Sequence, residues 1–69
     1  MENDDRWFNI NFDSIQKSHE NEFVVISKRK IVVHDKNIEK VFEKIRKVGI
    51  DSKNVLIEFI PERGLVVIL

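Results

Sequence analysis

The most regular pattern of hydrophobic and polar positions lies in the segment NIEKVFEKIRKVG, residues 37–49. Its apolar residues recur at intervals of three and four and so fall on one stripe of a helix; they are Ile38, Val41, Phe42, Ile45 and Val48. Asn37 stands where a helix N-cap belongs, and Gly49 stands where a left-handed residue ends a helix. The pattern therefore predicts a helix over this segment, which Ile50 closes with an apolar contact.

Four short apolar runs predict four strands. Residues 22–27 and 30–34 are rich in valine and isoleucine without alternation, which is typical of strands buried on both faces. Residues 55–60 and 65–69 give two further strands. The turn between the first two runs contains neither glycine nor asparagine, so a tight two-residue primed turn is disfavoured and we expect a slightly longer loop.

The N-terminal third has a weaker pattern. Residues 1–6 are polar and are expected to be disordered. Residues 7–21 are expected to form an N-terminal arm and a short helix over 12–18, with Asn11 as its N-cap and Ile15 facing inward. The apolar spacing in the arm also fits a short strand, but the helix is the preferred interpretation.

Together these elements predict a single domain over residues 1–69, with a ββαββ core at 22–69. The fold class is α+β, in the order α-β-β-α-β-β. We expect one antiparallel-dominated, four-stranded sheet with the long helix packed on one face through a right-handed crossover. The first strand is placed at the centre, between the second and the third.

Several segments resemble a family of short prokaryotic proteins of unknown function. The family pattern contains a helix of the type N-Y-E-E-L, then E-W-V-A-V, G-K-V-V-A-H-G-K-D-L, K-G-I-D, F-I-P and a final apolar run. The matching segments are Asn11–Ile15, Glu22–Ile26, Lys30–Ile38, Val48–Asp51 and Ile57–Pro61, followed by the apolar run at 65–69. This chain has Arg29 where the pattern has a turn glycine, and Asp35 where the pattern has a glycine after the histidine. The resemblance implies the fold and carries no catalytic residues to this chain.

The composition narrows the classes of protein. The chain contains no cysteine, which excludes disulfides and Cys-based metal sites and suits a reducing compartment. It shows no signal peptide and no apolar run near 18 residues, so we expect a cytoplasmic protein without a membrane span. The formal net charge is zero, although residues 1–22 carry a net −4 and residues 23–69 a net +4. These halves either attract two partners or, as we prefer, attract each other within one fold.

The residue types argue against an enzyme. No cysteine or threonine is available as a nucleophile, and the only glycines are Gly49 and Gly64, so no glycine-rich phosphate loop exists. His19 and His34 lie in different predicted elements and are too few for a zinc site. An acid–base pair of His34 with Asp35 is less favoured than a histidine that simply ends a strand. We therefore expect no catalytic residue, no cofactor and no metal.

Basic residues in the middle of the chain raise the alternative of nucleic-acid binding. The candidate contacts are Lys28, Arg29, Lys30 and Lys36. The long helix mixes acids among its lysines, as solvated surfaces do, and the net charge is zero. Nucleic acid is therefore the less favoured partner.

An uncovered apolar sheet surface is the main functional prediction. In the first two strands one face carries Val24, Ile26 and Val32, and the other carries Phe23, Val25, Ile31 and Val33. One helix covers only one face, so the second face or an edge must be covered by the N-terminal arm or by another chain. We expect a small non-catalytic interaction or regulatory module, a homodimer with a possible further protein partner. Its predicted interface residues are Trp7, Phe8, Val66, Ile68 and Leu69.

Overall fold

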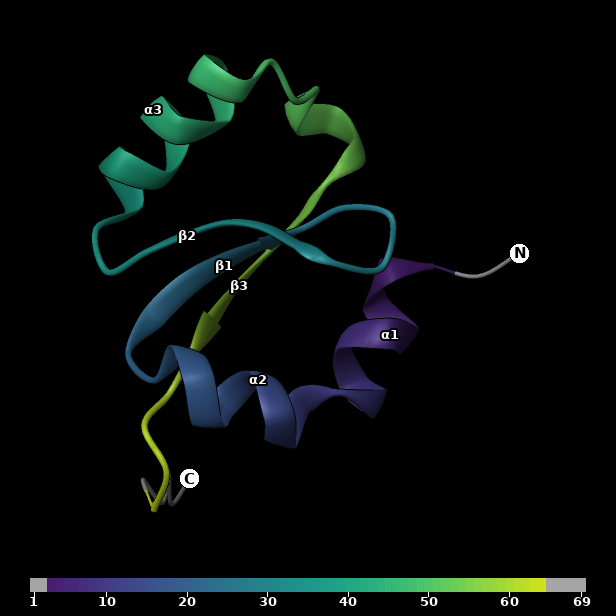
Figure 1. The fold of residues 1–69 in the computed structure, drawn as a ribbon, viewed down its shortest axis with the longest axis vertical. Helices are drawn as coiled ribbons and strands as arrows, with labels where there is room; N and C mark the ends of the chain where they lie inside the picture. Colours follow the sequence, from purple (N-terminus) through teal and green to yellow (C-terminus); the bar gives the residue numbers. More distant parts are fainter. Residues whose placement is uncertain (1–2, 65–69) are drawn as a thin grey trace, which may run out of the picture.

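The computed structural model describes residues 3–64 of the chain. The helices are α1 (Asp4–Ile10), α2 (Phe12–His19) and α3 (Ile38–Val48), with a short 3₁₀ helix η1 (Ser52–Asn54); the strands are β1 (Glu22–Ile26), β2 (Ile31–Asp35) and β3 (Leu56–Ile60). The strands form an antiparallel sheet in the order β2-β1-β3. Figure 1 shows this sheet between two helical layers, α3 on one face and the α1–α2 pair on the other.

The α+β class and the central position of the first strand are confirmed. The predicted four-stranded sheet is not: within residues 3–64 the sheet has three strands. The predicted fourth strand, residues 65–69, lies outside the described residues.

Helix α3 forms as its local sequence dictates. The Asn37 side chain accepts a hydrogen bond of 2.8 Å from the Glu39 backbone N–H and so caps the first turn. Gly49 adopts a left-handed φ of 73°, and the Ile50 N–H donates back to the Ile45 carbonyl at 3.2 Å. Both ends of this helix were predicted from the sequence, and both are confirmed.

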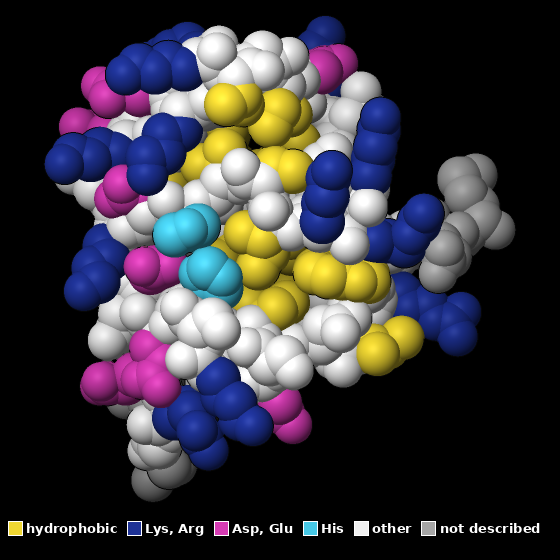
Figure 2. All heavy atoms as spheres, in the orientation of Figure 1, with side chains coloured by type: hydrophobic (Ala, Val, Ile, Leu, Met, Phe, Trp, Pro, Cys, Tyr) yellow, Lys and Arg dark blue, Asp and Glu magenta, His cyan; other side chains and the backbone are white. Residues whose placement is uncertain are grey.

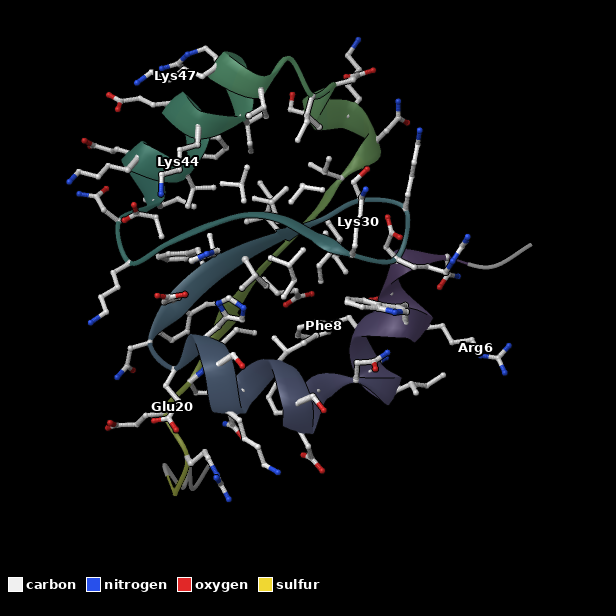
Figure 3. All side chains as sticks on the ribbon, in the orientation of Figure 1. Arg6, Phe8, Glu20, Lys30, Lys44 and Lys47 are labelled. Atoms are coloured by element: carbon white, nitrogen blue, oxygen red, sulfur yellow. The ribbon has the colours of Figure 1, made fainter. Side chains whose placement is uncertain are left out.

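The second face of the sheet is covered by α1 and α2. Its core consists of five buried apolar residues: Phe8, Ile15, Val24, Ile26 and Ile60. Figure 3 shows Phe8 pointing from α1 toward the sheet. The prediction that residues 1–6 are disordered is wrong for residues 4–6, which form the first turns of α1. Helix α1 was not predicted because its seven residues contain too few apolar positions to form a clear stripe. Burial against the sheet stabilises it instead.

Local hydrogen bonds cap both ends of α1. Asn3 caps α1, because its Oδ1 accepts from the Arg6 N–H at 2.8 Å. Asn11 occupies the predicted N-cap position of α2, but its side chain donates to the Trp7 carbonyl at 2.8 Å instead of accepting from α2. Asn11 therefore ends α1, and its carbonyl accepts from the Ile15 N–H at 3.0 Å where α2 begins.

The β1–β2 turn differs from the sequence prediction. Ser27 and Lys30 exchange two backbone hydrogen bonds of 3.0 and 3.2 Å, so the loop contains only Lys28 and Arg29. Both have positive φ, 52° and 59°, as in a primed two-residue turn. The prediction of a longer loop is therefore wrong. The Arg29 N–H donates to Asp4 Oδ1 at 2.8 Å, and this contact with α1 helps to hold the strained turn.

A register shift in the β1–β2 ladder changes which side chains share a face. Val25 pairs with Val33 but Ile26 pairs with Ile31, so Val32 is an extra residue, as in a β-bulge. Ile31 consequently packs on the α1–α2 side, whereas Val32 and Val33 both pack on the α3 side. The assignment of Ile31 and Val32 by simple alternation is wrong for this reason.

Candidate functional site

The most concentrated group of polar side chains joins three elements on the α1–α2 side. His19 lies in the last turn of α2, Glu22 begins β1, and His34 lies near the end of β2. Glu22 points to the same face as Val24, two residues on, and Val24 pairs with His34 across the ladder. The register therefore brings the Glu22 and His34 side chains together as diagonal neighbours on this face.

The turn between α2 and β1 brings His19 to the same place. Asn21 adopts a positive φ of 60°, and its N–H donates to the Ile60 carbonyl at 2.7 Å. Asparagine is one of the few residues with a side chain that tolerate this conformation readily. The turn fixes the end of α2 against the sheet, so His19 and Glu22 face each other three residues apart.

Both imidazole rings contact the same carboxylate oxygen of Glu22. His19 Nδ1 lies 2.9 Å from Glu22 Oε1, and His34 Nδ1 lies 3.1 Å from the same atom. The two rings are 4.6 Å apart between centroids. Figure 2 shows the two histidines side by side on the surface, with an acidic side chain against them. His19 and Glu22 are mostly buried, whereas the His34 side chain is 52% exposed.

The hydrogen bond from His19 lowers the pKa of Glu22 below its ordinary value, burial opposes this effect, and the neighbouring His34 adds to it. The carboxylate is therefore held in its ionised form. One ligand atom from each of the three side chains lies within 4.8 Å of the others, which is the spacing of a possible metal site. We call these three residues the histidine–glutamate cluster.

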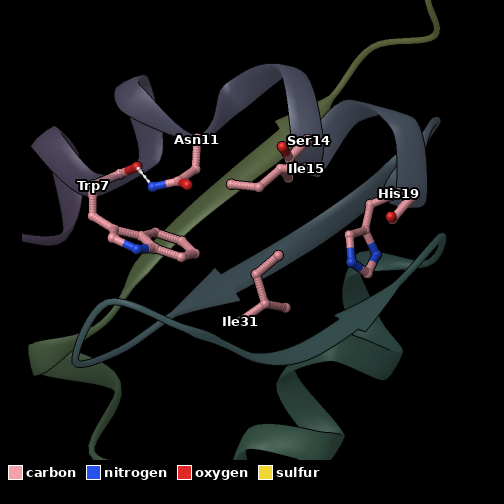
Figure 4. A pocket seen from close by; sticks show the side chains of 7 residues that line it. Trp7, Asn11, Ser14, Ile15, His19 and Ile31 are labelled. Carbon is pink, nitrogen blue, oxygen red and sulfur yellow. Dashed lines mark hydrogen bonds between the residues drawn. The ribbon is translucent and has the colours of Figure 1, made fainter.

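A shallow hollow of about 220 Å³ borders this cluster on the α1–α2 side. Its walls come from α1, α2 and β2, and its lining residues are Trp7, Asn11, Ser14, Ile15, Ser18, His19 and Ile31. Figure 4 shows Trp7 at one end and His19 at the other. The hollow is amphipathic. Its apolar lining comes from Trp7, Ile15 and Ile31, and its polar lining from Asn11, Ser14, Ser18 and His19.

Sequence reasoning missed this cluster because it treated the two histidines as members of separate elements. The available signal was the His19–Glu22 spacing across a helix-to-strand turn. The contribution of His34 depends on the extra residue in β2: without it, His34 would pair with Phe23 and face α3. No pattern in the sequence marks that shift.

Of the predicted interface residues, the structure describes Trp7 and Phe8. Phe8 is only 8% exposed and belongs to the core of its own chain, so it offers a partner little area. Trp7 is partly buried against the same core. Val66, Ile68 and Leu69 lie outside the described residues.

The structure instead exposes aromatic surface on the α3 side. Phe59, on β3, is 46% exposed, and its ring lies 5.0 Å from that of Phe23 on β1. Helix α3 packs mainly on β2 and β1; on β3, Ile57 packs with the same core, whereas Phe59 remains exposed. Other large apolar side chains that are exposed are Ile10, Phe42 and Val48.

The predicted nucleic-acid contacts are divided between the two ends of β2. Lys28, Arg29 and Lys30 form the hairpin tip, whereas Lys36 follows the opposite end of the strand, roughly 16 Å away by strand rise. Near Lys36 the positive charge is partly neutralised, because Asp35 pairs with Lys44 at 3.0 Å. The four cations therefore do not make one patch.

Comparison with known proteins identifies a family. A model described as a family of unknown function (DUF5678) matches residues 14–63. This match agrees with the expected membership in a family of unknown function. No curated protein and no solved structure matches the chain. Within residues 3–64, none of the helices has the length and apolar character needed to cross a membrane.

Proposed function

Because the chain belongs to a family of unknown function (DUF5678), we propose a function from its geometry. The proposed function is a small non-catalytic interaction module that forms a homodimer. The observation that carries the proposal is Phe59, which is 46% exposed on the α3-side sheet face. We call Phe59 and the adjoining Phe23 the aromatic surface. Aromatic side chains bury large areas when an interface forms and are enriched among its strongest contacts.

The proposed occupant of the aromatic surface is a second copy of the chain. The formal net charge is zero, so two copies meet without net repulsion. Helix α3, on the same side of the sheet, has a polar face that carries acids and bases together: Glu39, Lys40, Glu43, Lys44, Arg46 and Lys47. Such a mixed surface can pair with itself about a two-fold axis, as a symmetric dimer requires.

The earlier reason for a dimer, an uncovered second sheet face, does not support the proposal. Helices α1 and α2 cover that face with the chain's own residues. The proposal therefore rests on β3 and the aromatic surface alone. The absence of catalysis and the cytoplasmic location rest on the sequence, and both stay predictions.

Replacing Phe59 by Asp is expected to shift the protein from dimer to monomer. Loss of an aromatic anchor costs about 2 kcal/mol, or roughly a 30-fold increase in the dimer Kd. The measurement is sedimentation velocity or light scattering over a concentration series. Phe59→Thr serves as a second variant, because threonine keeps the strand propensity and adds no charge.

The matched control is Ile10→Asp, which places the same charge on an exposed apolar position of α1, on the other side of the sheet. This variant is expected to remain dimeric. A strict monomer for the unaltered protein at high concentration would sink the proposal, and so would equal effects of the two aspartate variants. Circular dichroism shows that each variant is folded before its mass is interpreted.

A second candidate, nucleic-acid binding at the hairpin tip, is favoured by one observation. Lys28 and Arg29 both hold positive φ, where residues with a side chain cost of the order of 1 kcal/mol each. Such strain concentrates at functional positions. Asparagine and glycine adopt these backbone angles with less strain, yet the turn carries two cations. This is the reason to test the hairpin tip for contacts with phosphate groups.

The double variant Lys28→Asn/Arg29→Gly is expected to raise the free energy of unfolding by roughly 1 kcal/mol, because Asn-Gly is the preferred pair for this turn. The hydrogen bond to Asp4 survives, since Arg29 donates it from the backbone. Urea denaturation measures the gain, with Lys36→Asn as a control outside the tip. If the tip contacts phosphates, the double variant also loses affinity in filter binding at low salt. Higher stability with unchanged nucleic-acid binding would rule out this candidate.

A further inference from the structure

We propose that His19, Glu22 and His34 bind one divalent first-row transition-metal ion, with zinc as the expected occupant. The site lies on the α1–α2 side of the sheet, whereas the aromatic surface lies on the α3 side. The proposal is therefore independent of the dimer and goes beyond it.

The donor set fits this class of ion. Two imidazoles and one carboxylate suit zinc and other first-row ions such as cobalt and nickel, and they suit calcium or magnesium poorly. A neutral imidazole protonated at Nε2 presents Nδ1 as a lone-pair donor. Both Nδ1 atoms lie against Glu22 Oε1, and a bound ion takes the place of the protons that hydrogen-bond them to this oxygen.

The two distances to Glu22 require only a small adjustment, and the three ligand atoms all lie within 4.8 Å of one another. Donors about 2.0 Å from a tetrahedral zinc ion lie roughly 3.3 Å from one another. The two observed nitrogen-to-oxygen distances are 2.9 and 3.1 Å, so the groups need to separate by a few tenths of an ångström. His34 supplies this freedom, because its side chain is half exposed and little packing holds it.

The backbone holds the three residues in place before any ion arrives. Glu22 and His34 are fixed by the β1–β2 ladder, and His19 is fixed by the turn at Asn21. Sites on such regular elements keep their geometry better than sites on loops. Three protein ligands leave at least one position of a tetrahedral ion to water or an outside ligand, so the site is of the open kind.

A metal-free role is the competing explanation, in which two histidines only hydrogen-bond Glu22. In that arrangement each ring donates one Nδ1–H to Glu22 Oε1, with the ring centroids 4.6 Å apart. A divalent ion uses both rings as neutral donors and is held by the carboxylate charge. This difference makes direct metal binding the deciding measurement.

The test uses the full chain without a histidine tag, treated with chelator and then titrated with zinc by calorimetry. Cobalt serves as a second probe, because its visible absorption reports nitrogen and oxygen ligation. We expect saturation at one ion per chain and a Tm that rises with free zinc concentration. His34→Ala and Glu22→Gln are each expected to weaken zinc binding roughly 100-fold. Replacing residues that only hydrogen-bond a metal ligand already costs about 10- to 100-fold, and these two residues are ligands themselves.

The matched control is Glu20→Gln, which removes an exposed carboxylate two residues from Glu22 and outside the cluster. It is expected to leave the affinity unchanged. No saturable uptake of zinc or cobalt by the intact chain overturns the proposal, and so does uptake that survives both His34→Ala and Glu22→Gln. Because His34 is half exposed, His34→Ala keeps the fold even if Glu22→Gln does not.

Discussion

Replacing Phe8 by Ala is expected to lower the free energy of unfolding by about 3–5 kcal/mol. Phe8 is the residue by which α1 enters the core of the α1–α2 side, where it packs with Ile15, Val24 and Ile60. Its ring also meets Phe12 edge-on at 5.5 Å between centroids. A domain of this size has a total stability of only roughly 3–10 kcal/mol, so this variant should be partly unfolded at room temperature.

Urea denaturation followed by circular dichroism measures this loss, and the fluorescence of Trp7, the only tryptophan in the chain, reports on the same layer. The control is Ile10→Ala on the same helix, where the side chain is 72% exposed. This change is expected to stay within about 0.5 kcal/mol. Similar stabilities for the two variants would mean that α1 does not cover the sheet as described.

Ile45→Ala tests the opposite layer, with an expected loss of about 2–5 kcal/mol. Ile45 is 3% exposed and packs with Val41, Val25 and Val33, where α3 meets β1 and β2. Removing its outer carbons leaves a cavity that the rigid sheet cannot fill. Chemical denaturation again gives the value.

Val48→Ala is the matched control for the α3 layer, because Val48 lies on the same helix with its side chain mostly exposed. Alanine also has the higher helix propensity, so the expected change is near zero or slightly stabilising. A loss for Val48→Ala as large as that for Ile45→Ala would contradict the packing of α3. Large losses from both Phe8 and Ile45 would show that the sheet needs cover on both faces.

The two core variants also bear on function. They separate residues that build the fold from residues that are free to bind, which the sequence could not do. Phe8 was predicted at an interface because one helix covers only one face of the sheet, and the other face needed cover from the N-terminal arm or from another chain. Phe59 was predicted only as part of an alternating strand, although the structure leaves it nearly half exposed. Exposure depends on what packs against a residue, and that information is not local.

The sequence alone determined the elements whose signals are local. The stripe of α3, its Asn37 cap and its Gly49 end follow from side-chain spacing and backbone preference within one segment, and the structure agrees. The three strands within residues 3–64 followed from runs of β-branched residues. These features need no knowledge of distant residues.

Tertiary structure decided the rest. Helix α1 forms because the sheet buries Phe8, and the strained turn at Lys28 and Arg29 persists with help from Asp4. The histidine–glutamate cluster depends on one extra residue in β2, which turns His34 to the face of Glu22. Because side chains alternate along a strand, a shift of one residue reverses the face, and only the packing of both layers selects the register. The candidate metal site is thus a property of the folded sheet, while the elements that carry its ligands were already encoded locally.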